Sequence, residues 1–170
     1  MQSIVSSLGA MDQPPWVAAF QSGFSAAAES LNLENLDTFA GFYAQDAQFI
    51  DPFASLQGVQ QIRASYLSML TNLHGARFVC QDWAQASAGG NNSVRMVITW
   101  TFFFRIRPAG PEVCIHGASW LEVNSISQRI EFHRDYWDAS ELLAAFPALG
   151  WLIRGVKKRV AAAGHVMEKS

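Results

Sequence analysis

Hydrophobic side chains recur every three to four residues through the first part of the chain, a spacing typical of helices. The spacing predicts a helix that begins at Trp16 and a second helix that follows Asn35, a candidate N-cap. The inner face of the second helix would hold Leu36, Phe39, Ala40 and Tyr43. A short strand over residues 46–51 ends at Pro52, and Gly58 precedes a third helix. The inner face of that helix would hold Val59, Ile62, Tyr66, Met69, Leu70 and Leu73.

After Gly75 the hydrophobic positions alternate, which is typical of strands. We expect strands over residues 77–86, 93–107, 113–123 and 130–137. The last three would form an antiparallel meander, because short turn-forming segments join them. One face of the second of these strands would bury Val94, Met96, Ile98, Trp100, Phe102 and Phe104. Helices followed by a curved antiparallel sheet predict an α+β domain.

The chain of 170 residues is predicted to form one domain over residues 16–138. Residues 1–15 are small and polar and are expected to be a flexible leader. Residues 139–170 return to helical spacing, interrupted at Pro147, and predict a C-terminal helical tail packed on the domain. An apolar stripe on this tail lies opposite basic residues at positions 154–159, which we expect to be a solvated face rather than a membrane contact.

Composition and charge exclude several classes of function. The net charge of -2 gives no field that would attract nucleic acid. The N-terminus lacks the pattern of a signal peptide, and no apolar run reaches the roughly 18 residues of a membrane span. We therefore expect a cytoplasmic protein in which Cys80 and Cys114 are reduced packing residues rather than a disulfide.

Motifs that hold a metal or a cofactor are not evident in the sequence. The 4 histidines show no ligand spacing, and no glycine-rich phosphate loop follows a strand. A Gly-x-Ser-x-Gly elbow is also missing. Any chemistry is therefore expected to use side chains alone, without a cofactor.

Two aromatic segments carry carboxylates where a buried strand would exclude them: FYAQDAQFIDPF, residues 42–53, and FHRDYWD, residues 132–138. In the first, Phe49 and Asp51 share one side of the strand. In the second, one side is shared by His133, Asp135 and Trp137. We interpret the two segments as opposite walls of one apolar pocket. Tyr66, Met69, Phe49 and Ser119 are further candidates for its lining.

Each candidate has a catalytic and a structural interpretation. Asp51 is either a desolvated base that removes a proton next to a carbonyl, or a strand-end residue that caps the turn before Gly58. His133 and Asp135 either face Asp51 as an acid and an electrophile, or have structural partners. In the structural case His133 would stack on an aromatic ring and Asp135 would pair with Arg134, Arg63 or Arg77.

The order of elements and the residues at their joints resemble the nuclear transport factor 2-like fold, a cone of curved sheet closed by helices. YAQDAQFIDPF followed by Gly58 is similar to the ketosteroid isomerase pattern, which implies that Asp51 is the general base. RIEFHRDYWD resembles SnoaL-like polyketide cyclases, whose last strand carries an acid near a Trp, a role for Asp135 or Asp138. The first helix has Ala27 near the place of the isomerase Tyr, and Ser119 stands near the place of its second acid.

Two functions follow as hypotheses. The first is cofactor-free acid/base chemistry on a hydrophobic carbonyl compound, as an isomerase or cyclase, with Asp51 as base, His133 or Asp135 as acid and Ser119 as a weak oxyanion donor. The second is a non-catalytic ligand-binding or dimerisation module. The strand segment Trp100–Phe104 is apolar on both faces, so we expect a homodimer through the sheet, or a cover formed by the C-terminal helices.

Overall fold

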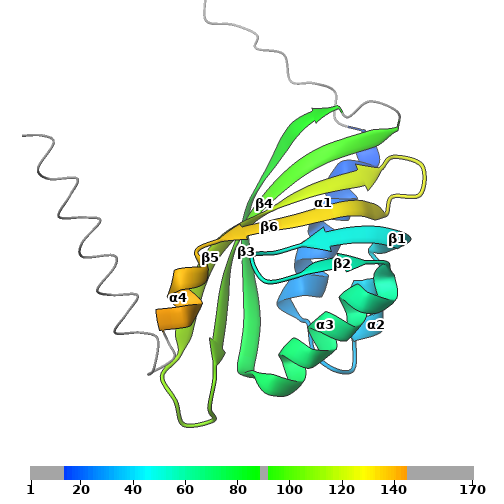
Figure 1. Ribbon diagram of the computed structural model, residues 1–170. Helices are drawn as coiled ribbons and strands as arrows, with labels where there is room; N and C mark the ends of the chain where they lie inside the picture. The colour runs from blue at the N-terminus through cyan, green and yellow to red at the C-terminus, as the bar shows by residue number, and fades with distance from the viewer. Residues whose placement is uncertain (1–13, 89–91, 145–170) are drawn as a thin grey trace, which may run out of the picture.

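The computed structural model describes residues 14–88 and 92–144 (Figure 1). The predicted leader up to residue 13, the turn residues 89–91, Pro147 and the basic residues at positions 154–159 lie outside the described residues. The elements are α1 (Pro15–Glu29), α2 (Leu36–Ala40), β1 (Tyr43–Ile50), β2 (Ser55–Gln57), α3 (Val59–Asn72), β3 (His74–Ala88), β4 (Ser93–Arg105), β5 (Val113–Asn124), β6 (Ile130–Trp137) and α4 (Ala139–Ala144).

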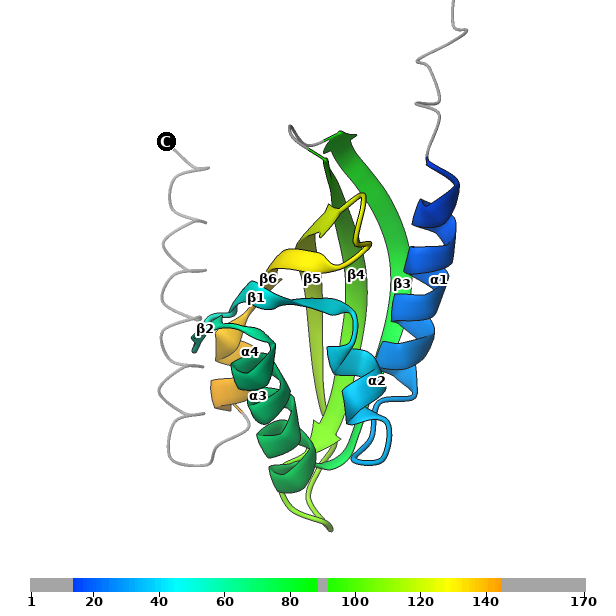
Figure 2. The same cartoon turned by 90° about the vertical axis from the view of Figure 1, so that its right-hand side faces the viewer.

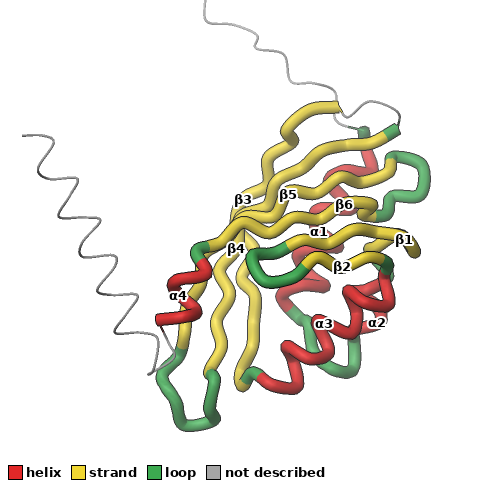
Figure 3. The backbone as a smooth tube through the Cα atoms, in the orientation of Figure 1, coloured by secondary structure: helices red, strands yellow, loops and turns green. Residues whose placement is uncertain are grey.

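The strands form one six-stranded sheet in the order β2-β1-β6-β5-β4-β3 (Figure 3). Strands β3 to β6 are joined as an antiparallel meander, which confirms the prediction for the last three. Strand β1 runs parallel to β6 and antiparallel to β2, so the sheet is mixed. The predicted α+β class is therefore confirmed.

The sheet is strongly bent, and the N-terminal helices pack on it (Figure 2). Helix α1 packs against β3, and α3 packs against β1 and β2. The alternation in β4 buries all six side chains predicted for its inner face. Phe24 of α1 lies edge-to-face against Phe42 and Trp83, so aromatic rings fill the space between α1 and the sheet. In residues 14–88 and 92–144, no helix is long and apolar enough to span a membrane.

The second helix is shorter than its hydrophobic spacing predicts. It ends at Ala40, and Tyr43 opens β1 instead of lying on the helix. Gly41 closes the helix with a hydrogen bond from its N–H to the Asp37 carbonyl. The carbonyl of Phe42 then accepts from the N–H of Ile130, so pairing with β6 starts here rather than at residue 46. The pairing of Tyr43 with Ile130 of β6 therefore outweighs the helical spacing that placed Tyr43 on the second helix.

The side chain of Asn35 does not cap α2, contrary to the prediction. Its Oδ1 accepts from the Asn32 N–H at 2.8 Å, so Asn35 closes the loop before the helix instead. The sequence also gave no sign of β2, a three-residue strand that pairs with the end of β1. Gly58 follows β2 with φ +86°, a backbone conformation that favours glycine, and α3 begins at the next residue.

Candidate active site

An apolar cavity of about 290 Å³ lies between α3, the loop after β1 and strands β3 to β6. Six residues that the sequence placed in a pocket line it: Phe49, Asp51, Tyr66, Met69, Asp135 and Trp137. The remaining lining consists of Phe53, Ser65, Leu73, Phe78, Trp100, Phe102, Phe104, Ile106, Ile115 and Leu142. A mostly apolar cavity with few polar groups is typical of a small-molecule site, and this volume is at the lower end of the usual range.

Strand β6 turns His133, Asp135 and Trp137 to the inside, as their spacing predicts, while Arg134 and Tyr136 are exposed. Only Asp135 and Trp137 reach the cavity. His133 is 2% exposed and lies behind the wall, as does Ser119 at 3%. These two residues therefore support the lining and do not form part of it.

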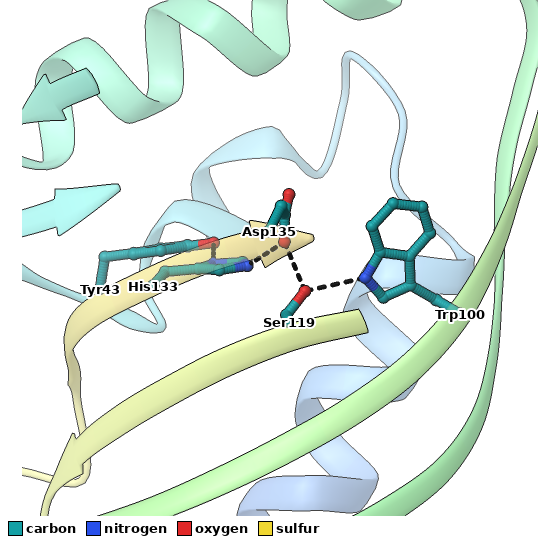
Figure 4. Close-up of polar contacts among 5 residues, drawn as sticks. All are labelled: Tyr43, Trp100, Ser119, His133 and Asp135. Carbon is teal, nitrogen blue, oxygen red and sulfur yellow. Dashed lines mark hydrogen bonds and ion pairs between the residues drawn. The ribbon is translucent and has the colours of Figure 1, made fainter. Parts of the chain in front are cut away.

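A continuous row of hydrogen bonds runs behind this wall (Figure 4). Trp100 Nε1 donates to Ser119 Oγ at 2.8 Å, and Ser119 Oγ donates to Asp135 Oδ1 at 2.5 Å. His133 Nε2 lies 2.8 Å from the same Oδ1, and His133 Nδ1 lies 2.8 Å from the Tyr43 hydroxyl. Strands β1, β4, β5 and β6 each contribute at least one member, so the row depends on the register of the sheet.

The donors and acceptors in this row assign its protons. The Trp100 indole can only donate, so Ser119 must accept from it and use its own hydrogen on Asp135. For an ionised Asp135 carboxylate, which only accepts, His133 Nε2 would carry the hydrogen of this contact toward Oδ1. In a neutral imidazole Nδ1 then accepts from the Tyr43 hydroxyl. Within the described residues both hydrogen bonds of Asp135 go to Oδ1, and Oδ2 points away from the row (Figure 4).

Two tyrosines, the buried Tyr43 and the partly buried Tyr66, complete the polar side of the site. Burial raises the pKa of Tyr43 well above its ordinary value, and the neighbouring Tyr66 adds to this. Burial, followed by the charge of Asp135, also raises the pKa of Tyr66. Both side chains therefore stay protonated at any ordinary pH. Tyr66 thus lines the cavity as a neutral phenol whose hydroxyl interacts with that of Tyr43.

Asp51 lines the cavity and also makes the structural contacts that its sequence context allowed. Its Oδ1 accepts from the N–H groups of Phe53 and Ala54, both at 2.7 Å. These bonds fix the turn that follows β1, as expected of an Asp before Pro. Its role as a base stays a prediction.

Of the structural contacts predicted for His133 and Asp135, the one for His133 is present and the one for Asp135 is not. His133 stacks on Tyr43 with ring centroids 5.8 Å apart and also faces Phe49. Asp135 pairs with His133, whereas Arg63 pairs with Asp37, Arg77 pairs with Glu112 and the Arg134 guanidinium lies over the Tyr136 ring. The pairing of Asp135 with an arginine is therefore wrong.

Ser119 is not free to act as the oxyanion donor that the sequence suggested, because its one hydrogen is used on Asp135. Sequence reasoning also missed the roles of Tyr43 and Trp100. Trp100 was recognised only as an inward-facing residue, and the hydrogen bond to Ser119 depends on the register between β4 and β5, which pairs Ile98 with Ser119. The sequence offered one indication of these roles: the N–H of a buried Trp or the O–H of a buried Tyr usually has a hydrogen-bond partner.

The described lining residues include two carboxylates and no Lys, Arg or His. In the described parts of the chain no group of three or more His, Cys, Asp or Glu side chains is arranged to hold a metal ion. The site therefore combines aromatic walls, two acids and one phenol.

A bent mixed sheet with helices enclosing an apolar cavity is the nuclear transport factor 2-like arrangement. The family model for the SnoaL-like domain matches residues 24–133, well over half of the chain. The chain belongs to the SnoaL-like domain family.

Solved structures with the same fold include a hypothetical protein with a ketosteroid isomerase-like fold from Catenulispora acidiphila, in complex with trimethylamine. It has a TM-score of 0.60 and 17% identity, over 74% of this chain and 90% of that one. A putative SnoaL-like polyketide cyclase from Shewanella putrefaciens has a TM-score of 0.57 and 16% identity, over 76% and 95%. A putative scytalone dehydratase from Novosphingobium aromaticivorans has a TM-score of 0.59 and 9% identity, over 72% and 81%. No curated protein sequence matches the chain.

Proposed function

We propose that the chain is a cofactor-free acid/base catalyst that acts on a small hydrophobic carbonyl compound, as an isomerase or cyclase. One observation carries the proposal. The Asp135 carboxylate is fixed through Oδ1 by Ser119 and His133, while Oδ2 remains for a ligand in an apolar cavity. A positioned carboxylate in such surroundings is suited to removing a proton from carbon.

The proposed reaction needs two groups of the cavity. Asp135 Oδ2 takes a proton from the carbon next to the carbonyl, and the electron pair of that C–H bond forms the enolate. The Tyr66 hydroxyl donates a hydrogen bond to the enolate oxygen. Asp135 becomes neutral as the enolate becomes negative, so the net charge of the cavity does not change. Return of the proton from Asp135 to another carbon of a conjugated enolate gives an isomer. Attack of the enolate carbon on a second carbonyl instead forms a ring, and the alkoxide oxygen left by the broken C=O π bond takes the proton from Asp135.

The structure favours Asp135 over Asp51 as the base. Both carboxylates line the cavity, but Asp51 holds the turn after β1 through backbone N–H groups. Asp135 instead contacts an imidazole, which can stabilise either protonation state of its partner. His133 and Ser119 are positioning residues in this account, and Asp51 is the second acid of the site.

Deuterium uptake next to the carbonyl of 2-tetralone, followed by proton NMR in D₂O, tests the proposal with the full chain. We expect Asp135→Asn to lower the enzyme-dependent exchange rate by roughly 10²–10⁴-fold. Asp82→Asn, an exposed carboxylate on β3, is the matched control and should leave the rate unchanged. If Asp51→Asn greatly lowered the exchange rate while Asp135→Asn stayed active, the base would be Asp51 instead. Exchange no faster than in buffer, across a panel of enolisable ketones, would reject the catalytic proposal.

The charge of the cavity favours a second candidate function, the binding of a small organic cation. The described lining contains two carboxylates and no cationic side chain. It also contains Trp100 and Trp137, whose indole rings attract an ammonium group. The trimethylamine in the Catenulispora acidiphila structure gives this candidate a precedent in the fold.

Matched ligands distinguish the two candidates. Tetramethylammonium and neopentyl alcohol have similar shapes and differ in charge, and their binding can be followed by the indole N–H signals of Trp100 and Trp137. A cation-binding protein should bind the ammonium about tenfold more tightly or better, and lose that preference in Asp135→Asn. Equal affinities would reject this second function.

A further inference from the structure

A cysteine and a histidine meet on the outer face of the sheet, away from the cavity. Cys114 and His116 both lie on β5, and the residue between them, Ile115, faces the core. Cys114 is exposed, and its Sγ lies 3.7 Å from His116 Nε2. A thiol and an imidazole within hydrogen-bond reach are the first two parts of an activated nucleophile.

The imidazole of His116 is held by a third side chain. Its Nδ1 lies 3.1 Å from Thr101 Oγ1, on the residue that faces His116 across β4 and β5. Thr101 is 4% exposed, and its Oγ1 also accepts from Gln81 Nε2 at 3.2 Å. A buried hydroxyl on the otherwise solvent-facing side of the sheet therefore orients the ring that contacts the thiol.

A second basic group lies on the other side of the thiol. Register places Arg77, Phe103 and Cys114 in one row across three strands. The Arg77 guanidinium lies 4.1 Å above the Phe103 ring and pairs with Glu112 at 2.8 Å. The geometry that carries the site is therefore the exposed Cys114 thiol beside the His116 imidazole, and such exposed cysteines are the reactive ones in proteins.

The other cysteine of the chain has the opposite surroundings. Cys80 is partly buried, its Sγ lies 4.0 Å from the Ser25 carbonyl oxygen, and burial raises its pKa to about 11. Cys80 is therefore an inert thiol at neutral pH. The chain thus contains its own control for the reactivity of Cys114.

We propose that Cys114 and His116 form a thiol modification site for small disulfides such as oxidised glutathione. His116 takes the proton of the Cys114 thiol, and the thiolate attacks one sulfur of the disulfide. A Cys114–S–S–R bond forms, the original S–S bond breaks, and the leaving thiolate RS⁻ takes up a proton. No net oxidation occurs beyond the exchange of one disulfide for another. This site is independent of the catalytic proposal.

The test exposes dilute full-length protein to oxidised glutathione at neutral pH and follows the adduct by intact mass. Peptide mapping of the wild-type adduct locates the modified cysteine without any variant. We expect one adduct, on Cys114, which persists in Cys80→Ser and is lost in Cys114→Ser. An adduct on Cys80 alone, or no adduct, would overturn the proposal.

The role of His116 needs its own comparison. His116→Gln should slow the modification of Cys114 about three- to tenfold, because the thiolate loses its partner. His74→Gln removes an exposed histidine at the start of β3 and should leave the rate unchanged. Equal rates in wild type and His116→Gln, at unchanged circular dichroism, would show that exposure alone makes Cys114 reactive and would overturn the assigned pair.

Discussion

At the scale of single residues, the site depends on a few close approaches. The Trp100 ring lies directly over Gly117, where a Cβ atom would collide with the indole. That position brings Trp100 Nε1 to Ser119, whose hydrogen in turn goes to Asp135. Because residue 117 on β5 is a glycine, the Trp100 ring can take this position, and the resulting hydrogen bonds help to orient the Asp135 carboxylate on β6.

Gly117→Ala tests this dependence. The added methyl group must displace the Trp100 ring, so we expect the free energy of unfolding to fall by about 1–3 kcal/mol. The rate of deuterium exchange into 2-tetralone should fall as well, because Ser119 would lose its hydrogen bond from Trp100 and would hold Asp135 less firmly. Gly23→Ala in α1 is the control: its Cβ would meet Phe42 at an ordinary 3.5 Å, and helix propensity should raise stability by about 0.5–1 kcal/mol. A fully stable and active Gly117→Ala protein would contradict the described contact.

The sequence predicted which side chains of β6 face inward because that depends only on alternation along one strand. It identified Asp135 and Trp137 as cavity residues for this reason. It did not identify the contact of Tyr43 with His133, because that contact depends on the parallel pairing of β1 and β6 and on a shift of register within it. Side-chain contacts between two strands cannot be predicted from the sequence until the partner strand and its register are known.

At the scale of elements, Gly58 sets the direction of α3, which carries Tyr66 and Met69 to the cavity. Its φ of +86° and ψ of 148° lie in a region open almost only to glycine. The sequence predicted the helix from its periodicity and the position of this glycine. It did not predict β2 just before it, because three residues are too few to show a period.

We expect Gly58→Ala to lower the free energy of unfolding by about 1–3 kcal/mol, through strain at this backbone position. Gln60→Ala, at an exposed position in the first turn of the same helix, should change it by no more than about 0.5 kcal/mol. Urea unfolding followed by circular dichroism measures both. Equal stabilities of the two variants would show that the backbone at residue 58 relaxes without cost.

At the scale of the whole molecule, stability should depend on pH through Cys80. Burial raises its pKa from 9.0 to about 11, so the unfolded chain ionises this thiol first. The stability that Cys80 contributes is complete below pH 9 and is lost as the pH rises toward 11. Tyr43 and Tyr66, whose pKa values are also raised, act in the same direction above pH 10.

Wild type should therefore lose about 1–2 kcal/mol more than Cys80→Ala between pH 9 and pH 11, after allowance for partial exposure of the thiol. Denaturant unfolding at a series of pH values provides the comparison. Parallel curves for the two proteins would mean that Cys80 ionises equally easily in the folded and unfolded chains.

The dimer predicted from the sequence stays a prediction, and the outer face of the sheet is where it would form. Val79 and Tyr136 are 40% and 55% exposed there. We expect Val79→Lys to shift a wild-type dimer toward monomer in sedimentation velocity, because the charge would be buried in the interface. A wild-type protein that sediments as a monomer at all concentrations would contradict the prediction.

The central claim is that the Asp135 carboxyl group, held by Ser119 and His133 at the wall of the cavity, acts as the base. Long-range proton–nitrogen NMR of the His133 ring at neutral pH, assigned with His133→Gln, tests it most directly. We predict a hydrogen on Nε2, directed at Asp135. A ring with its only hydrogen on Nδ1 would mean that the proton of this contact belongs to Asp135, and Asp135 could not then be the base.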